Sequence, residues 1–156
     1  MSETKSTVPS LFLREEELRR GVELMFFAGQ VLAHAADPAL ENMRLGRAHQ
    51  RALHFIHRRP GLTVGELLGV LRITKQSLNR VMQRLIAEAL VAQRASAEDR
   101  RRRELRATDK GAALARRLES AQLACIAAAY RAAGPHAVGG FWEVLEHIKN
   151  ADRSED

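Results

Sequence analysis

The apolar positions between Leu11 and Ala36 recur at helical spacing and fall into two rows. One row runs through Leu18, Val22, Met25, Gly29 and Leu32, and the other through Leu24, Phe27, Val31 and Ala35. A helix on the surface of a monomer needs only one apolar stripe. The pattern therefore predicts a helix whose second stripe meets another chain.

Proline and glycine separate this helix from the next one. Asp37-Pro38 is predicted to end the first helix, because proline lacks an N–H and restricts the residue before it. A second helix is predicted from about Met43 to Arg58, and Arg59-Pro60-Gly61 stops it. Its expected buried positions are Leu45, Ala48, Ala52, Phe55 and Ile56.

A helix–turn–helix pattern follows. Thr63 and Glu66 have the spacing of a capping box, in which each side chain satisfies a backbone N–H of the other residue. After a tight turn, Thr74 is the expected N-cap of a helix that reaches about Ala89. The two helices are predicted to bury Val64, Leu67, Leu68 and Leu71 in the first, and Leu78, Val81, Met82, Leu85 and Ile86 in the second.

The exposed face of the second of these helices carries long donors and no acid before Glu88. Solvated helices normally mix charges of both signs, which is the simpler alternative for any charged face. Donors without carboxylates suit phosphates and base edges, so we interpret this as a recognition helix. Its candidate contacts are Gln76, Asn79 and Arg80 for base edges, and Lys75, Ser77 and Arg84 for phosphates.

A hairpin is predicted next, with strands at Leu90–Arg94 and Arg102–Ala107. Its tip could be only a solvated loop, but arginines beside a recognition helix are better explained as a wing. Guanidinium groups are attracted to narrow A·T-rich minor grooves. Within the wing, Arg101 is the candidate for the minor groove, and the candidates for the DNA backbone are Arg100, Arg102 and Arg103.

The chain ends are amphipathic and rich in alanine. Thr108 is a plausible cap for a long helix to about Ala132, and Gly134-Pro135 precedes a last helix that is expected to bury Val138, Phe141, Leu145 and Ile148. The predicted fold class is mainly α, a winged helix–turn–helix. Its expected parts are a flexible arm at 1–10, a DNA-binding lobe at 43–108, and a helical dimerisation layer at 11–36 and 109–151.

Charge is concentrated in the helix–turn–helix and wing. The 156 residues include 25 Lys and Arg against 19 Asp and Glu, a net charge of +6. The segment from Arg72 to Arg106 alone holds ten basic and four acidic residues, so the rest of the chain is neutral. A surplus confined to one motif indicates a surface that binds a polyanion.

The order of elements, together with Asp99, Arg101, Thr108 and Gly111, resembles the MarR family of bacterial winged-helix regulators. That family's signature is Asp-x-Arg in the wing, followed by leucine, threonine, two residues and glycine; this chain has Ala107 in the leucine position. The resemblance covers about Leu11 to Ala151. It implies a homodimer held by the first, fifth and sixth helices, with Arg101 in the minor groove and Asp99 orienting it or its neighbours.

The same resemblance implies a response to a small phenolic or other aromatic ligand. The ligand is expected between the dimerisation layer and the DNA-binding lobe, where it would change the separation of the two lobes. The residues expected to line that crevice are Phe26, Phe27, Arg47, His54 and Leu114.

The sequence gives little support for metal binding, a reactive cysteine or catalysis. His49, His54 and His57 share a helix but lack a cysteine or carboxylate at ligand spacing, so ordinary packing is favoured over a metal site. Cys125 has apolar neighbours, which predicts a buried and inert thiol. We find no nucleophile–base pair, phosphate-binding glycine loop or paired carboxylates, and we expect no enzyme and no cofactor.

Localisation is expected to be cytoplasmic and nucleoid-associated, without a membrane partner. A single cysteine fits a reducing compartment, and the longest apolar stretch is about half of the ~20 residues that span a bilayer.

The function predicted is a regulator, most simply a ligand-responsive repressor, that binds double-stranded DNA at a near-palindromic operator as a homodimer. Two alternatives remain: an architectural protein that binds DNA without sequence preference or effector, and a winged helix that binds other proteins.

Overall fold

The computed structural model describes residues 10–151. The expected N-terminal arm at 1–10 lies outside these residues, apart from Ser10. The elements, in chain order, are η1 (Leu11–Leu13), α1 (Glu15–His34), α2 (Asp37–Glu41), α3 (Arg47–Arg58), β1 (Leu62–Thr63), α4 (Val64–Leu71), α5 (Lys75–Ala87), β2 (Val91–Ala95), β3 (Arg103–Ala107), α6 (Asp109–Ala133) and α7 (Pro135–Ala151).

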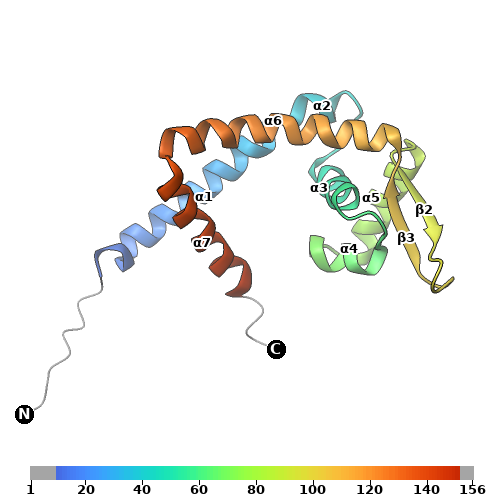
Figure 1. Ribbon diagram of the computed structural model, residues 1–156, viewed down its shortest axis with the longest axis horizontal. Coiled ribbons are helices and arrows are strands. Elements are labelled where there is room, and N and C mark those ends of the chain that lie inside the picture. Colours follow the sequence, from blue (N-terminus) through green and yellow to red (C-terminus); the bar gives the residue numbers. More distant parts are fainter. Residues whose placement is uncertain (1–9, 152–156) are drawn as a thin grey trace, which may run out of the picture.

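The long helix α6 connects the two ends of an elongated molecule (Figure 1). The β2–β3 hairpin lies at one end with α3, α4 and α5, and α1 and α7 lie at the other end. This arrangement confirms the predicted fold class, a mainly helical winged helix–turn–helix with a small antiparallel sheet. None of the helices in residues 10–151 has the length and apolarity required to cross a membrane.

The sheet has the strand order β1-β3-β2, so β3 is central and the predicted hairpin is confirmed. Leu105 of β3 is fully buried and pairs with Leu62 of β1 on one side. The two-residue strand β1 was not predicted. Ala107 lies opposite Val91 and packs, partly buried, against the core, so the small residue in the leucine position is accommodated.

The hydrophobic core is confined to the middle of the chain. Its buried apolar residues lie between Ala36 and Leu118, whereas α1 and α7 contain no buried residue. The expected burial in the last helix is therefore wrong for the single chain: Phe141 is 45% exposed and Ile148 is 49% exposed. The fully buried large side chains are Leu53, Ile56, Leu67, Leu78, Leu85, Leu90 and Leu105.

Several predicted boundaries and burials differ from the structure. The first helix is interrupted at Arg14, and Asp37-Pro38 begins α2 instead of only ending α1, because proline fits the first turn of a helix. The second helix starts at Arg47 and not at Met43. Two residues that were expected in the core, Ala48 and Ile86, are exposed.

Candidate nucleic-acid interface

The helix–turn–helix is built on two threonine caps, as predicted. The Thr63 backbone N–H donates to the Glu66 carboxylate over 2.8 Å, and the Glu66 N–H donates to the Thr63 hydroxyl over 3.2 Å. The Thr74 hydroxyl accepts from the Ser77 N–H over 3.1 Å. These bonds satisfy N–H groups that the first turns of α4 and α5 leave unpaired.

The Thr63 cap and a wing arginine also lower the pKa of the Glu66 carboxyl below its usual value. Hydrogen bonds from the Thr63 backbone and hydroxyl are the main causes, and the nearby Arg102 guanidinium adds to them. Glu66 therefore stays ionised beside the wing, and Arg102 pairs with it over 3.7 Å.

Helix α5 divides into a buried face and an outward polar face. Leu78, Val81, Met82 and Leu85 pack into the core. The side chains of Lys75, Gln76, Asn79 and Arg80 are exposed, whereas Ser77 is half-buried. The Ser77 hydroxyl accepts from the Thr74 hydroxyl over 2.9 Å, which leaves its own hydrogen free to be donated outward. Four of the six predicted α5 contact residues thus share one solvent-facing surface, and Ser77 lies at its edge.

The tip of the wing has an ordered backbone. The Asp99 carboxylate accepts from the Arg101 N–H over 2.9 Å, and the Asp99 carbonyl accepts from the Arg102 N–H over 2.9 Å. The Ser96 N–H donates to the Arg102 carbonyl over 2.9 Å and closes the loop. Asp99 therefore fixes the backbone of the arginine run, and its carboxylate pairs with no guanidinium group of residues 10–151.

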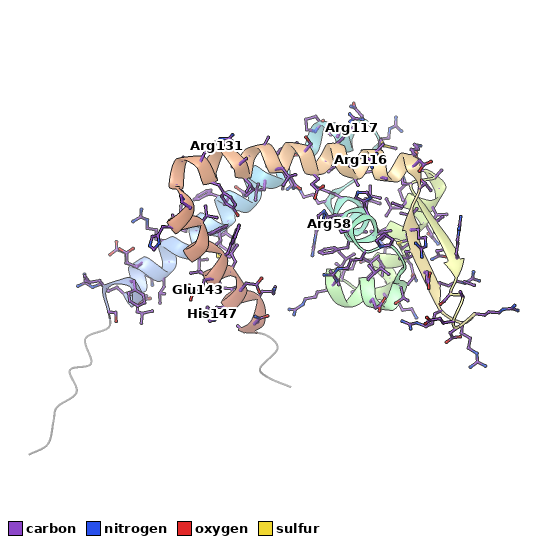
Figure 2. The ribbon with its side chains drawn as sticks, viewed as in Figure 1. Arg58, Arg116, Arg117, Arg131, Glu143 and His147 are labelled. Carbon is purple, nitrogen blue, oxygen red and sulfur yellow. The ribbon has the colours of Figure 1, made fainter. Side chains whose placement is uncertain are left out.

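Most cations of α5 and the wing tip have no acidic partner. Within residues 10–151, the side chains of Lys75, Arg80, Arg100, Arg101 and Arg103 make no ion pair or hydrogen bond. Figure 2 shows long side chains at the hairpin tip that extend away from the ribbon. Uncompensated guanidinium groups on a protruding hairpin create a positive field that attracts phosphates.

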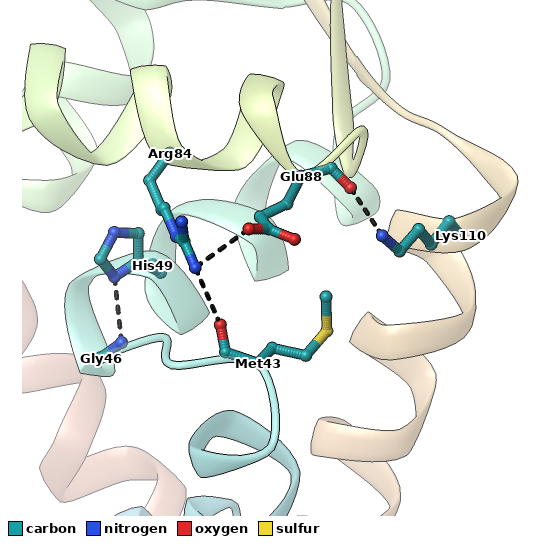
Figure 3. Close-up of polar contacts among 6 residues, drawn as sticks. All are labelled: Met43, Gly46, His49, Arg84, Glu88 and Lys110. Carbon is teal, nitrogen blue, oxygen red and sulfur yellow. Dashed lines mark hydrogen bonds and ion pairs between the residues drawn. The ribbon is translucent and has the colours of Figure 1, made fainter.

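Arg84 differs from the other predicted contact residues because its guanidinium group is occupied within the protein (Figure 3). It donates to the Met43 carbonyl over 3.3 Å and pairs with the Glu88 carboxylate over 3.0 Å. Arg84 is half-buried, so it does not belong with the exposed cations of α5 and the wing tip that have no acidic partner within residues 10–151.

The start of α6 is attached to the end of α5. The Thr108 N–H donates to the Leu90 carbonyl over 3.0 Å, and the Thr108 hydroxyl donates to the Ala89 carbonyl over 2.6 Å. The same hydroxyl accepts from the Gly111 N–H over 3.0 Å, and the Lys110 ammonium donates to the Glu88 carbonyl over 2.8 Å. Thr108 was predicted as a cap, but its second role as a clamp on α5 was not.

A cavity of about 410 Å³ lies where α1, α3 and α6 meet. Gly29, Leu32, Ala33 and Phe55 supply its apolar wall. Arg47, Gln50, Arg51, His54 and Gln122 supply its polar atoms. Gln122 of α6 donates to the Leu32 carbonyl of α1 over 3.0 Å, which fixes the helix crossing beside the cavity. The Arg47 guanidinium pairs with the Asp37 carboxylate over 3.6 Å, and the Arg51 guanidinium donates to the Leu71 carbonyl over 3.3 Å. Each guanidinium group has further N–H donors, which suit a small organic anion.

Two of the five predicted crevice residues, Arg47 and His54, line this cavity. Phe26 and Phe27 are 67% and 63% exposed on α1 and do not line it, and Leu114 belongs to the core. The polar residues Gln50, Arg51 and Gln122 were not predicted. Gln50 and Arg51 share α3 with Arg47 and His54, and their helical spacing was visible in the sequence, but the contribution of α6 was not.

A larger groove of about 810 Å³ lies between α2 and α6, and its floor consists mainly of alanines. Arg116 and Arg117 stand at its edge, and Figure 2 places both on the part of α6 that runs beside α2. This groove is more open than the cavity beside His54, so it offers a small ligand less enclosure.

Two histidines of α3, His49 and His54, have a lowered pKa. Burial is the main cause that lowers the pKa of His54, opposed by the Glu119 carboxylate. Burial also lowers the pKa of His49, and the nearby Arg84 guanidinium adds to the effect. Among the described residues, no three His, Cys, Asp or Glu side chains gather in a way that could hold a metal ion. Cys125 is half-buried and not fully buried as expected.

Comparison with known proteins gives consistent results. A sequence profile of the MarR family matches residues 45–102. The chain is 54% identical over 136 residues to the HTH-type transcriptional regulator PetP of Rhodobacter capsulatus, a match that covers 87% of this chain and 82% of PetP.

Two solved structures are also similar. One is a MarR family transcriptional regulator from Silicibacter pomeroyi, with a TM-score of 0.71 and 21% identity, covering 85% of this chain and 90% of that one. The other is the Mycobacterium tuberculosis MarR family protein Rv2887 in complex with p-aminosalicylic acid, with a TM-score of 0.58 and 27% identity, covering 81% of this chain and 96% of that one.

The fold, the wing signature and the identity to PetP over most of both chains lead to the same conclusion. The chain belongs to the MarR family, whose members are DNA-binding transcriptional regulators and not enzymes.

Proposed function

We propose that the protein is a repressor that binds a near-palindromic operator as a homodimer and releases it when a small aromatic anion binds. The observation that carries the DNA-binding part is the set of five cations on α5 and the wing tip that have no acidic partner within residues 10–151. Cationic side chains without an acidic partner favour binding to phosphates, because each phosphate that they neutralise releases counterions condensed on the DNA.

In this proposal, α5 lies in the major groove and the wing follows the adjacent minor groove. Gln76, Asn79 and Arg80 read base edges, and Lys75 and Ser77 hold phosphates. Arg101 enters the minor groove, while Arg100, Arg102 and Arg103 contact the backbone. Arg102 has to exchange its weak pair with Glu66 for a phosphate, which is feasible because both side chains are more than half exposed.

The dimer is supported by large apolar side chains that α1, η1 and α7 leave in solvent. Phe12 is 71% exposed, Phe26 67% and Trp142 56%. Apolar patches of this extent mark interaction surfaces, because exposing them to water is unfavourable. A second copy with the same surface would cover them, and its twofold axis would place two α5 helices about 34–36 Å apart, one turn of DNA.

The ligand is proposed to occupy the cavity beside His54. Its volume of about 410 Å³ is in the range of small-molecule sites. Beyond their contacts with Asp37 and the Leu71 carbonyl, Arg47 and Arg51 have N–H groups to donate to a carboxylate, and Phe55 and Leu32 offer apolar surface to a ring. The similar protein Rv2887 has been crystallised with p-aminosalicylic and salicylic acids, which fits this ligand class.

The DNA-binding proposal is tested by selecting duplexes from a random pool at about 150 mM salt. A regulator should enrich one inverted repeat and hold it against an excess of genomic DNA. Asn79→Ala and Arg80→Ala should each relax that preference by roughly 1–3 kcal/mol. Recovery of unrelated sequences would favour the architectural alternative.

The ligand proposal is tested by calorimetric titration with salicylate and its neutral amide. Salicylate should bind and release the operator, the amide should bind more weakly, and Arg47→Gln should reduce the difference between them. Equal behaviour of the two compounds would contradict an anion site.

A further inference from the structure

Arg84 lies in the C-terminal half of α5, and its side chain turns from the DNA-facing surface towards the rest of the protein. One terminal nitrogen, Nη2, serves two partners: the Met43 carbonyl at 3.3 Å and the Glu88 carboxylate at 3.0 Å. Figure 3 shows the guanidinium group between the α2–α3 loop and the end of α5. The spacing of Arg84 on α5 suggested a phosphate contact, but its contacts indicate another role.

These contacts continue into α6. Glu88 holds Arg84 through its carboxylate, and its own backbone carbonyl accepts from the Lys110 ammonium over 2.8 Å. A single series of polar contacts thus joins the α2–α3 loop, the C-terminal half of α5 and the first turn of α6. One end of the series, Met43, follows α2, which packs on α6 and α1. The other end, Lys110, belongs to α6 itself.

The polar contacts of Arg84 fix the orientation of α5 in a way that apolar packing cannot. Leu78, Val81, Met82 and Leu85 hold α5 by packing, which is non-directional and leaves small rotations of a helix inexpensive. A guanidinium group fixed to a carbonyl and a carboxylate is directional. The rotation of α5 about its own axis decides where the base-reading face points, so a contact that fixes this rotation affects recognition from a distance.

We propose that Arg84 is a positioning residue, which sets the orientation of α5 relative to α2 and α6 and does not itself contact DNA. The inference deepens the proposed sequence-specific binding and rests on it. A change in α5 orientation weakens base contacts selectively, because bidentate pairing tolerates little displacement, whereas attraction to phosphates depends mainly on charge. Removal of the Arg84 side chain therefore reduces discrimination and not general affinity.

The first test compares Arg84→Gln with Lys75→Gln in the full chain. Binding to the selected operator and to a random duplex is measured from about 50 to 200 mM salt. Arg84→Gln should leave the salt slope for the random duplex unchanged and lower the operator-to-random ratio about tenfold. Lys75→Gln, which removes an open cation, should lower the slope by about 0.9 for each phosphate that is no longer neutralised. A reduced slope in Arg84→Gln would overturn the proposal.

Glu88→Ala reaches the same contact from the other side. It removes the carboxylate that pairs with Arg84 and keeps the backbone carbonyl that Lys110 binds. The operator-to-random ratio should fall as in Arg84→Gln, and the double variant should be no worse than either single one, because the two residues act as a unit. If Glu88 only withheld Arg84 from phosphate, the variant would bind both duplexes more tightly at an unchanged ratio, and the proposal would be wrong.

A third measurement needs no DNA and separates this inference from the proposed function. Amide hydrogen exchange of the free protein should become faster at residues 43–46 and at the C-terminal half of α5 in Arg84→Gln, but not in Lys75→Gln. If no operator is recovered from the pool, the proposed function fails while this result still decides whether Arg84 holds α5. Unchanged exchange at both places would refute the positioning role.

Discussion

At Gly111 the first turn of α6 passes so close to the backbone of Leu90 that no side chain fits. A Cβ atom on Gly111 would lie 1.9 Å from the Leu90 carbonyl oxygen. That oxygen also accepts from the Thr108 N–H, so it cannot move aside without breaking a hydrogen bond. The glycine of the family signature is thus required by a close approach between α6 and the start of the wing.

Gly111→Ala should therefore destabilise the protein by about 1–3 kcal/mol, the usual cost of an added methyl group in a packed site. Urea denaturation followed by circular dichroism measures the change. Gly69→Ala in α4 is the matched control, because a Cβ there meets nothing within 4 Å; it should be neutral or stabilise by about 0.5–1 kcal/mol. Equal stability of the two variants would contradict the close approach of Gly111 to Leu90.

His49 is the second residue whose environment has a measurable consequence. Burial, helped by the Arg84 guanidinium, lowers the pKa of His49 below its ordinary value of 6.5. Its Nδ1 atom accepts from the Gly46 N–H over 3.0 Å, which requires the unprotonated nitrogen. Unfolding removes both effects, so the unfolded chain takes up a proton at a higher pH than the folded one. Stability is then complete above about pH 6.5 and declines as the pH falls below it.

We expect the free energy of unfolding to fall as the pH is lowered through about 6.5, and His49→Asn to make that decline shallower. Asparagine places an oxygen acceptor near the position of Nδ1 and does not titrate in this range. Part of the decline should remain, because the pKa of His54 is lowered too. An identical pH dependence in the variant and the wild type would show that His49 does not contribute.

At the scale of the elements, the tip of the wing is held in part by the side chain of Asp99. The Asp99 carboxylate receives the Arg101 N–H, and the Asp99 carbonyl receives the Arg102 N–H. The turn therefore fixes the backbone from which the arginine side chains extend, which would lower the backbone entropy cost of the proposed contacts with DNA.

Asp99→Ala and Asp99→Asn both remove one negative charge, but only asparagine retains an oxygen that can accept from Arg101. The alanine variant should bind operator DNA about fivefold more weakly than the asparagine variant, the equivalent of one hydrogen bond of about 1 kcal/mol. Fluorescence anisotropy at fixed salt measures the ratio, and thermal denaturation should show similar stability for both. Equal affinities would mean that the turn does not need this acceptor.

The sequence predicted the elements whose ends carry strong local signals. Thr63, Thr74 and Thr108 were identified as caps and are caps, because capping depends on residues within one turn. The start of α3 was misplaced by four residues, because Met43, Arg44 and Leu45 donate back to carbonyls at the end of α2 and Gly46 is the N-cap of α3. Strand β1 was missed because two residues carry no periodicity, and it exists only through pairing with β3.

The candidate interface was predicted to a similar extent and for a similar reason. The outward face of α5 and the run at the wing tip follow from local spacing and charge. Arg84 lies on the same helix, but no local pattern shows that the Met43 carbonyl reaches it from 41 positions earlier. The cavity residue Gln122 was likewise missed, because its place depends on how α6 crosses α1.

At the scale of the molecule, the core and the exposed apolar surface lie at opposite ends. The core fills the lobe around α3, α4 and α5, while no residue of α1 or α7 is fully buried. A single copy therefore leaves large apolar side chains of its terminal helices half or more exposed to water, such as Phe26 at 67% and Trp142 at 56%. This distribution is expected of a chain whose terminal helices complete their packing on a second copy.

Val144→Glu, on α7, should weaken the dimer at least tenfold, because an unpaired carboxylate in an apolar interface is costly. Val144 is 57% exposed in the single chain, so the substitution should not disturb the lobe. Sedimentation equilibrium measures the association, with Ile86→Glu as the control, since Ile86 is an exposed apolar residue of α5. A wild-type protein that sediments as a monomer would contradict the proposed assembly.

The attachment of α6 to the Glu88, Ala89 and Leu90 carbonyls has a practical consequence for engineering hybrid regulators. Thr108 and Lys110, at the start of α6, donate to these three successive carbonyls. Two parental sequences should therefore not be joined between the wing and α6, because the donors and acceptors would then come from different parents. A chimera that exchanges residues 75–83 keeps this joint and the Arg84 contacts intact. A chimera joined at a point within 84–111 would place contacting residues from two different parents side by side. It is expected to lose the DNA binding and the ligand response of both parents.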